Sequence, residues 1–204
     1  MNYRLNDISK IPVIALADGA EYILIAEPSA EARELIMAEK YFFHQDYQDD
    51  SALNMKPFIK VACFNAREEM EDTIIRWMHR IISMQESFEV MLNNYSGFPP
   101  HTIYARVQFP EPFKKLATQF SAIDQYLLSN GCKPLAFSKH PHVTIARKLH
   151  ERVYEKAMLD YSQRSFFASF YVNELVLLKR RSENESYRQA YKFGLTPVQH
   201  PLYD

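Results

Sequence analysis

Two segments of this chain repeat one pattern 84 positions apart, and this repeat constrains the fold more than any other feature of the sequence. Segments 56–62 and 140–146 both read basic residue, proline, ring, β-branched residue, polar residue, β-branched residue, alanine. The same offset matches further starts of strands and helices: Tyr22 falls near Arg106, Arg67 on Glu151, and Phe88 on Val172. The sequence therefore predicts two similar lobes related by a pseudo-twofold axis, with the matching strands facing each other across a cleft.

Hydrophobic periodicity predicts both strands and helices, and together with the repeat it favours an α+β fold of two pseudo-symmetric lobes with a central cleft between them. Strands are expected at 21–26, 57–64, 88–92, 102–109, 141–147, 166–178 and 187–193. Helices are expected from Ser29 to about 47, from Asn65 to Ile82, and over 111–130 and 151–162. One bilobal domain over 21–195 follows, with lobes at about 21–95 and 101–195, an N-terminal extension over 1–20 and a C-terminal tail over 196–204.

Local signals set several of these limits. Asn65 and Glu68 have the spacing of a capping box, which predicts a helix start at Asn65. The segment 93–100 is rich in turn-forming residues and predicts a connection between two strands. Gly131 is well placed to end the helix over 111–130.

The composition narrows the class of partner. A chain of 204 residues, 47% of them hydrophobic, can bury a core of ordinary size. Its net charge of -1 lacks the cationic excess that drives nonspecific binding to long nucleic acid, but leaves room for a small phosphate-bearing ligand. Cys63 and Cys132 make neither a disulfide framework nor a paired metal motif. Since no stretch approaches the roughly 18 apolar residues of a membrane helix, we expect a cytoplasmic protein without membrane contact.

The second repeat carries a candidate site on one face of its strand. Because side chains alternate along a strand, Val143 and Ile145 can enter the core while His142 and Thr144 point the other way. An imidazole that exchanges a proton beside a hydroxyl that can bind a phosphate oxygen suits phosphodiester chemistry. A single His-x-Thr match is common by chance, and a half-exposed strand histidine is the alternative.

In its context this strand resembles the second signature strand of the 2H phosphoesterases, the superfamily of 2′-5′ RNA ligases and cyclic phosphodiesterases. Looser similarities extend over most of the chain. The segment 22–27 before Pro28 is similar to the opening strand of that family, and Gly97-Phe98-Pro99 to its mid-chain turn. The segment 175–179 with Tyr187 is similar to its closing strand pair.

The resemblance implies a two-lobed clamp, with lobes of antiparallel sheet, helices outside and a central cleft. Each lobe then supplies a His-x-Thr or His-x-Ser motif. One histidine is then the general base and the other the general acid, the hydroxyls bind phosphate, and no metal or other cofactor is implied. His142 and Thr144 match the second motif, whereas Phe58 and Lys60 occupy the positions of the first. Phenylalanine cannot transfer a proton, and a positioned acid or base contributes about 10²- to 10⁴-fold to rate. Lys60 can still bind phosphate as a point charge.

Other residues are candidates to complete the cleft. His101 and His140 are the histidines that could replace the missing imidazole, with exposed loop positions as the alternative. Arg147 could attract phosphate, and the basic run 179–181 could do the same if it flanks the cleft mouth. Tyr187 and Tyr191 could stack on a base, although core packing is the expected role of at least one of them.

Three hypotheses remain open from the sequence. The first is an enzyme acting on a nucleotide or short RNA with a cyclic or 2′-5′ phosphodiester, through His142, Thr144, Lys60 and an unidentified second proton carrier. The second is a binding protein that keeps the phosphate cleft without the chemistry. The third is an interaction protein whose cleft is not used. The intact second motif argues against the third, and Phe58 argues against two-histidine catalysis.

Overall fold

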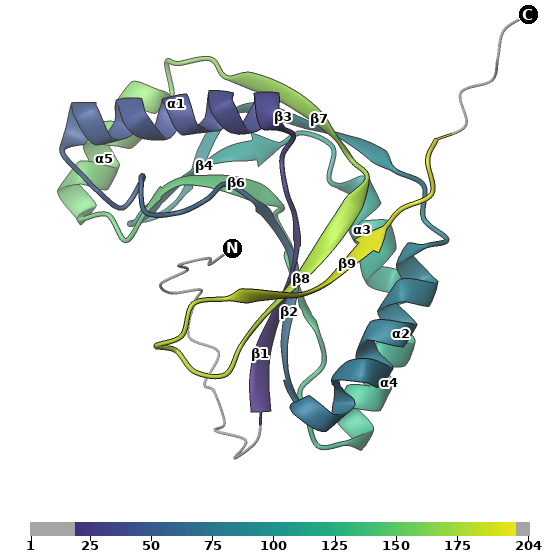
Figure 1. The fold of residues 1–204 in the computed structure, drawn as a ribbon. Coiled ribbons are helices and arrows are strands. Elements are labelled where there is room, and N and C mark those ends of the chain that lie inside the picture. The colour runs from purple at the N-terminus through teal and green to yellow at the C-terminus, as the bar shows by residue number, and fades with distance from the viewer. Residues whose placement is uncertain (1–18, 199–204) are drawn as a thin grey trace, which may run out of the picture.

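A computed structural model describes residues 19–198 as a curled antiparallel sheet with helices on its outer side (Figure 1). The strands are β1 (Gly19–Ala26), β2 (Ile59–Arg67), β3 (Phe88–Phe98), β4 (Thr102–Val107), β5 (Ala136–Phe137), β6 (His142–Arg147), β7 (Phe167–Val172), β8 (Glu174–Arg180) and β9 (Arg188–Gly194). The helices are α1 (Ala30–Tyr47), the 3-10 turn η1 (Glu68–Met70), α2 (Glu71–Ile82), α3 (Glu111–Gln119), α4 (Ser121–Ser129) and α5 (Glu151–Tyr161). The predicted α+β class is confirmed. Most of the expected extension over 1–20 and of the tail over 196–204 lies outside the described residues.

The strand order is β7-β3-β4-β6-β2-β1-β8-β9, with β5 added beside β2. We call the half with β2, β1, β8 and β9 the β2 lobe, and the half with β6, β4, β3 and β7 the β6 lobe. One strand of each repeat lies in the other half of the sheet, because β3 pairs with β4 and β8 pairs with β1. The expected limits of the lobes, at about 21–95 and 101–195, therefore need correction. The two halves of the sheet exchange strands and do not follow the order of the chain.

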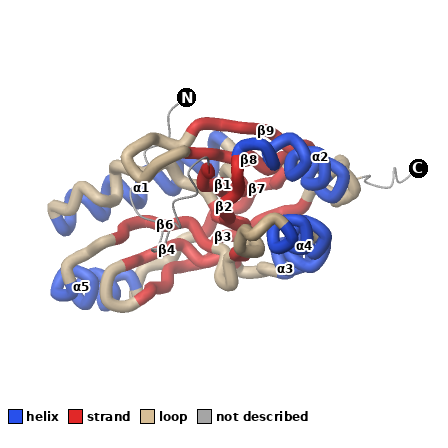
Figure 2. The backbone as a smooth tube through the Cα atoms, turned by 90° about the horizontal axis from the view of Figure 1, so that it is seen from below, coloured by secondary structure: helices blue, strands red, loops and turns tan. Residues whose placement is uncertain are grey.

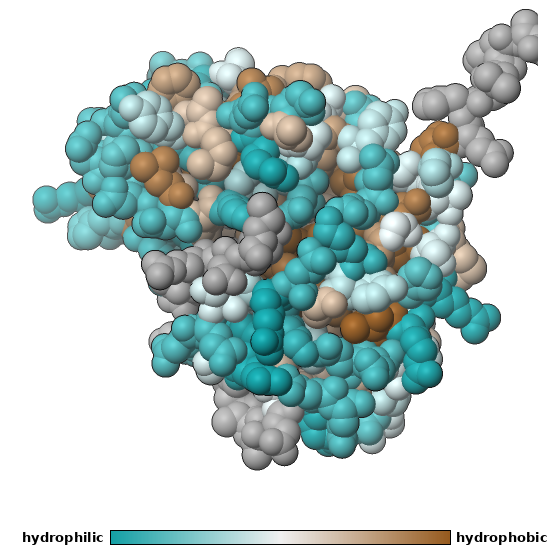
Figure 3. Space-filling model, viewed as in Figure 1, coloured by the Kyte–Doolittle hydropathy of each residue, from teal (hydrophilic) through white to brown (hydrophobic). Residues whose placement is uncertain are grey.

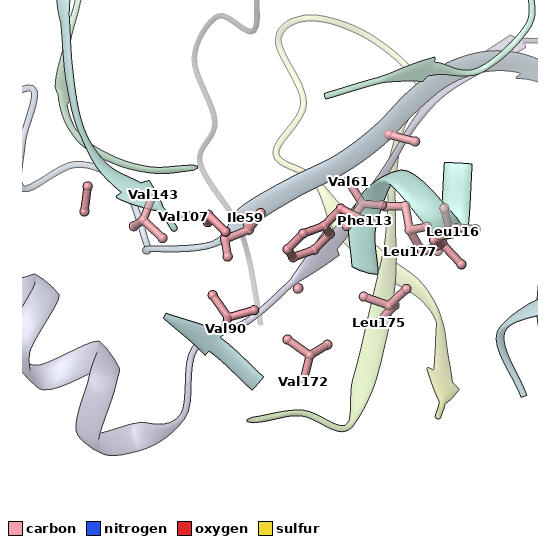
Figure 4. Packing of buried hydrophobic residues seen from close by; sticks show 14 of the residues in the cluster. Ile59, Val61, Val90, Val107, Phe113, Leu116, Val143, Val172, Leu175 and Leu177 are labelled. Carbon is pink, nitrogen blue, oxygen red and sulfur yellow. The ribbon is translucent and has the colours of Figure 1, made fainter. Parts of the chain in front are cut away.

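Helices cover one face of each lobe, and we call the opposite face of the sheet the inner face. Helices α1 and α5 pack on the β6 lobe, whereas α2 packs against β9 and α4 in the β2 lobe (Figures 1 and 2). One apolar core runs under both lobes, and Figure 4 shows Ile59 of β2 beside Val107 and Val143 of the other half. The surface in Figure 3 is mainly hydrophilic with separate hydrophobic patches. No helix within residues 19–198 is both long and apolar enough to cross a membrane.

The repeat predicted from the sequence has a structural counterpart at the centre of the sheet. Strands β2 and β6 meet at the register pair Ile59 and Val143, which are the same position in the two repeats. Each strand also has a bulge at an equivalent residue, Val61 in β2 and Ile145 in β6. These positions keep the offset of 84, whereas the strands beside them, β1 and β4, are offset by 79 because Ile25 and Tyr104 take equivalent places.

Three predicted limits are wrong for a common reason, namely strand pairing between distant segments. Asn65 does not cap a helix, because β2 continues beside β1 as far as the pair Gly19 and Arg67. The segment 93–100 belongs mostly to β3, which pairs with β4 as far as Phe98. The expected strand 166–178 divides at Asn173, because β7 pairs with β3 and β8 pairs with β1. Each of these segments gains ladder hydrogen bonds that local signals do not reveal.

The expected helix over 111–130 is divided at Phe120 into α3 and α4. The ring of Phe120 is fully buried and stacks on Phe137 at a centroid distance of 5.7 Å. Gly131 has the positive φ of 74° that a glycine after a helix end adopts readily, as predicted.

Helix α5 packs closely on the β6 lobe at Gly97 in β3, and a substitution there tests this packing. A Cβ at this position would lie 2.4 Å from Tyr154 Oη and 2.9 Å from Met158 Sδ. We expect Gly97→Ala to lower the free energy of unfolding by about 1–3 kcal/mol through overpacking. Chemical denaturation measures this loss. Gly194→Ala is the matched control, because its Cβ meets nothing within 4 Å. Adding Tyr154→Phe should recover part of the loss, and equal effects of both glycine variants would contradict this account.

Candidate phosphate site

The imidazole of His142 is held in one orientation on the inner face of β6. Its Nδ1 lies 2.6 Å from the backbone oxygen of His140. A carbonyl oxygen only accepts, so Nδ1 carries the proton and donates, which leaves the lone pair on Nε2. Val143 and Ile145 are fully buried, whereas His142 and Thr144 are partly exposed, as the alternation along the strand predicted.

Two aromatic side chains pack against this imidazole. The ring of Phe98, the last residue of β3, meets it edge-on at a centroid distance of 5.2 Å, and the ring of Tyr104 in β4 lies at 4.6 Å. The two aromatic rings also contact each other, at 4.6 Å. Tyr104 is the cross-strand partner of Thr144, so it shares the inner face with the motif. These residues limit the rotation of His142. The sequence offered a signal only for Phe98, through the Gly-Phe-Pro turn.

Lys60 lies opposite this imidazole on the neighbouring strand. The antiparallel pair of Ile59 and Val143 brings Lys60 across from His142, and Phe58 across from Thr144. Lys60 is also the cross-strand partner of Ile25, whose side chain lies on the inner face. The structure therefore brings His142, the predicted proton-transfer residue, together with Thr144 and Lys60, the residues predicted to bind phosphate.

The environment of His142 favours its neutral form. Burial lowers the pKa of the imidazole, and the nearby charge of Lys60 lowers it further. The hydrogen bond to the carbonyl of His140 acts in the opposite direction but does not reverse the shift. A lowered pKa keeps Nε2 unprotonated near neutral pH, which is the state of a general base.

Phe58 occupies an apolar environment on the other side of the site. Its partly buried ring packs against a cluster on the inner face of the β2 lobe: Ile23, Ile25, Met55, Cys63, Val176, Leu178 and Tyr187. The position equivalent to His142 is thus lined mainly by apolar side chains. The two half-sites share a backbone pattern and differ in chemistry.

Lys40 fixes the shape of the strand that carries the motif. This α1 residue is fully buried, and its Nζ donates to the backbone oxygens of Ala52 at 3.1 Å and Ile145 at 3.4 Å. Ile145 is the bulge residue that follows Thr144, so the amine binds the carbonyl that the bulge removes from the ladder. Burial lowers the pKa of Lys40 to about 7, with a further contribution from Arg147. The sequence carried a signal for this residue: a lysine on the buried stripe of α1.

The other candidate residues are placed as follows. His140 is exposed next to the site, and its ring lies 6.4 Å from that of Phe98. His101 Nδ1 contacts Thr102 Oγ1 at 3.0 Å, and Thr102 pairs with Arg147. His101 and Arg147 therefore lie at the far end of β6. At about 3.3 Å per residue, this end is roughly 16 Å along the strand from His142. His140 is the one candidate imidazole brought near the site.

The two candidate tyrosines lie on opposite faces of the β2 lobe. Tyr187 is fully buried in the cluster that surrounds Phe58, with the guanidinium of Arg180 at 4.6 Å from its ring centroid. Tyr191 packs against Phe193 and edge-on against His79 of α2, on the helix side of the sheet. Tyr187 thus has a packing position beside the site, and Tyr191 is directed away from it.

The basic run 179–181 is paired with carboxylates. Lys179 binds Glu71, Arg180 binds Glu21, and Arg181 binds Glu68. Its charges are therefore largely compensated within the protein, which argues against a phosphate-attracting cluster. Within residues 19–198, no group of three or more His, Cys, Asp or Glu side chains has the arrangement of a metal site.

Comparison with known proteins agrees with this fold. The model of the 2′-5′ RNA ligase superfamily matches residues 25–184. The chain therefore belongs to the 2′-5′ RNA ligase superfamily, a family of 2H phosphoesterases. A comparison with curated proteins finds no match.

Several solved structures share the fold. Escherichia coli LigT, in complex with 3′-AMP, is 19% identical, with a TM-score of 0.63 over 87% of this chain and 99% of LigT. TT0787 of Thermus thermophilus is 14% identical, with a TM-score of 0.67 over 88% of this chain and 100% of TT0787. The MHV ns2 PDE domain is 14% identical, with a TM-score of 0.52 over 78% of this chain and 99% of that domain. Similarity at these identities shows a common fold.

The buried amine of Lys40 should make stability depend on pH. Its pKa is about 7 in the folded protein and about 10.4 in an unfolded chain, so between these values the unfolded state binds more protons. The free energy of unfolding should then rise with pH above 7, by up to about 1.4 kcal/mol per pH unit from this group. Below pH 7 both states are protonated and the group adds no slope.

Chemical denaturation of the wild type and Lys40→Met at pH 7, 8 and 9 measures this contribution. The difference between wild type and variant should grow in favour of the wild type as pH rises. Lys114→Met is the matched control, since Lys114 is exposed and pairs only with Glu111. A difference that stays constant with pH would contradict the assigned shift.

Proposed function

We propose that this protein binds the phosphate group of a nucleotide or short RNA phosphodiester between His142, Thr144 and Lys60, without two-histidine acid–base catalysis. The observation that carries the proposal is the position of Phe58. Its ring packs into the apolar cluster where the family pattern would have a second imidazole. Half of the proton-transfer machinery is replaced by a packed ring, while the other half keeps an oriented imidazole.

The chemistry of the site supports phosphate as the ligand. Lys60 supplies an ammonium group, Thr144 a hydroxyl, and His142 an Nε2 that becomes a donor when protonated. The related protein LigT has been solved with 3′-AMP, NADP+ and phosphate, which are all phosphate-bearing ligands. A similar ligand in this chain would contact both lobes, because Lys60 and His142 lie on the two strands that meet at the centre of the sheet.

A second candidate function is one-histidine hydrolysis of a cyclic phosphodiester. It is favoured by the Nδ1 hydrogen bond to His140 and the lowered pKa, which together leave Nε2 able to accept a proton. His142 would take the proton from an attacking water, and the leaving oxygen would take its proton from solvent. Without a positioned acid this route should be slower than two-histidine catalysis by about 10²- to 10⁴-fold.

Binding and turnover separate these functions. We expect 3′-AMP to bind the wild type, and His142→Ala, Thr144→Val and Lys60→Met each to weaken binding by about tenfold or more, as expected for loss of a charge-assisted contact. Calorimetry measures binding, while 2′,3′-cyclic nucleotides and 2′-5′-linked dinucleotides serve as turnover substrates. His79→Ala is the control, since His79 lies on α2. Turnover abolished by His142→Ala would favour the second candidate, and no binding by the wild type would refute both.

The pH dependence of binding gives an independent measurement. Burial keeps the pKa of His142 low in the free protein, and a bound phosphate anion should raise it. Binding then takes up a proton, so affinity for 3′-AMP should increase as pH falls through the interval between these two pKa values. Titration from pH 8 to 5 should show this increase in the wild type and not in His142→Gln. The same slope in both proteins would remove His142 from the phosphate contacts.

Rebuilding the first motif tests whether Phe58 limits catalysis. We expect the double variant Phe58→His, Lys60→Thr to gain turnover of 2′,3′-cyclic nucleotides by about 10²- to 10⁴-fold over the wild type, because a second proton carrier is restored. Phe58→Leu with Lys60→Thr is the matched control, with an apolar side chain retained at position 58. An inactive but folded double variant would show that the apolar surroundings of Phe58, as well as its identity, exclude catalysis.

A further inference from the structure

The inner face that carries His142 continues through the β6 lobe to its edge strand. In β7 the side chains alternate strictly: Ala168, Phe170 and Val172 are buried in the core, whereas Phe167, Ser169 and Tyr171 are exposed. Since the buried set faces the helices, the exposed set shares the inner face with His142. β7 has β3 as its neighbour and ends the sheet on that side within the described residues.

Arg106 lies on this face directly beside His142. The two residues are cross-strand partners in β4 and β6, and Arg106 is exposed between the buried Ala105 and Val107. No carboxylate of residues 19–198 forms an ion pair with it. An uncompensated cation next to a phosphate site attracts further phosphate.

A row of side chains leads from this cation to an exposed aromatic ring. Between the pairs Leu92 with Val107 and Tyr95 with Ala105 the register of β3 against β4 shifts, so Asn93 and Asn94 both lie opposite Arg106. Asn93 in turn pairs with Phe167, whose side chain is 61% exposed. The row from His142 to Phe167 crosses three strand spacings, or about 14 Å. A ligand that covers both ends must therefore be longer than one nucleotide.

We propose that this row is a binding track for single-stranded RNA, with the phosphate at one end of the strand held at His142. Arg106 contacts the adjacent phosphate, and Phe167 stacks on a base further along. The inference rests on the proposed function and specifies its ligand as an oligonucleotide rather than a mononucleotide. Aromatic platforms combined with cations are the usual means of binding single strands without reading their sequence.

The negative charge of Glu89 limits the track on β7. Tyr171 is a second exposed ring on β7, but its cross-strand neighbour is Glu89, which is also exposed. A carboxylate repels the phosphates of an RNA strand, so the favourable path runs over Phe167 and stops before Tyr171. The track is short, which agrees with the absence of a large basic excess in the chain.

Affinity as a function of ligand length tests the proposal. The ligands are 3′-AMP and a fluorescent RNA pentamer with a 3′-phosphate, measured against the wild type, Phe167→Ala and Arg106→Met. We expect Phe167→Ala to weaken pentamer binding by about 5- to 150-fold, as for the loss of one stacked base, and to leave 3′-AMP binding unchanged. Arg106→Met should reduce the slope of log affinity against log salt for the pentamer by about one.

Phe42→Ala is the matched control, because Phe42 has a similar exposure of 48% but lies on helix α1. Thermal melting shows that each variant is folded. The track is overturned if the wild type binds 3′-AMP and the pentamer equally, or if Phe167→Ala changes neither affinity; in both cases the phosphate site itself still stands. Failure of the wild type to bind either ligand would overturn the proposed function and the track together.

Discussion

The meeting of β2 and β6 at Ile59 and Val143 is the contact on which the rest of the structure depends. Both side chains are fully buried, and they are the same residue position in the two repeats, so the pseudo-twofold axis passes between them. The pair joins the two lobes into one sheet and one core. It also sets Lys60 across from His142, which places a cation and an imidazole from different repeats next to each other on the inner face.

The symmetry of the backbone contrasts with the asymmetry of the chemistry. Equivalent bulges at Val61 and Ile145 show that both signature strands keep the same shape, yet one carries an oriented imidazole and the other a packed phenyl ring. Burying part of a phenyl ring, as at Phe58, stabilises a protein, whereas burying an unpaired imidazole costs free energy. The Phe58 half-site has therefore gained packing where a proton carrier would have to be kept in a polar setting. What remains is suited to holding charge.

The intact half-site depends on groups that do not themselves face a ligand. The carbonyl of His140 sets the tautomer of His142, the rings of Phe98 and Tyr104 restrict its rotation, and the amine of Lys40 fills the gap that the bulge leaves in the ladder. Helix α1 thus reaches across from the first repeat to stabilise the motif strand of the second. Strand exchange has the same effect, because β3 of the first repeat brings Phe98 to the site. The two repeats are not independent units.

The sequence by itself determined the class of fold, the offset of the central strands, the shared face of His142 and Thr144, and the difference between Phe58 and His142 at matching positions of the repeat. These follow from residue identity and from the period of two along a strand, which are local properties. Only the tertiary structure decided that β3 and β8 exchange lobes, that β2 continues through Asn65, and that Lys40, Phe98, Tyr104 and Arg106 surround or extend the site. Such contacts join residues far apart in the chain. They depend on strand order, register and bulges, which periodicity within one segment does not encode.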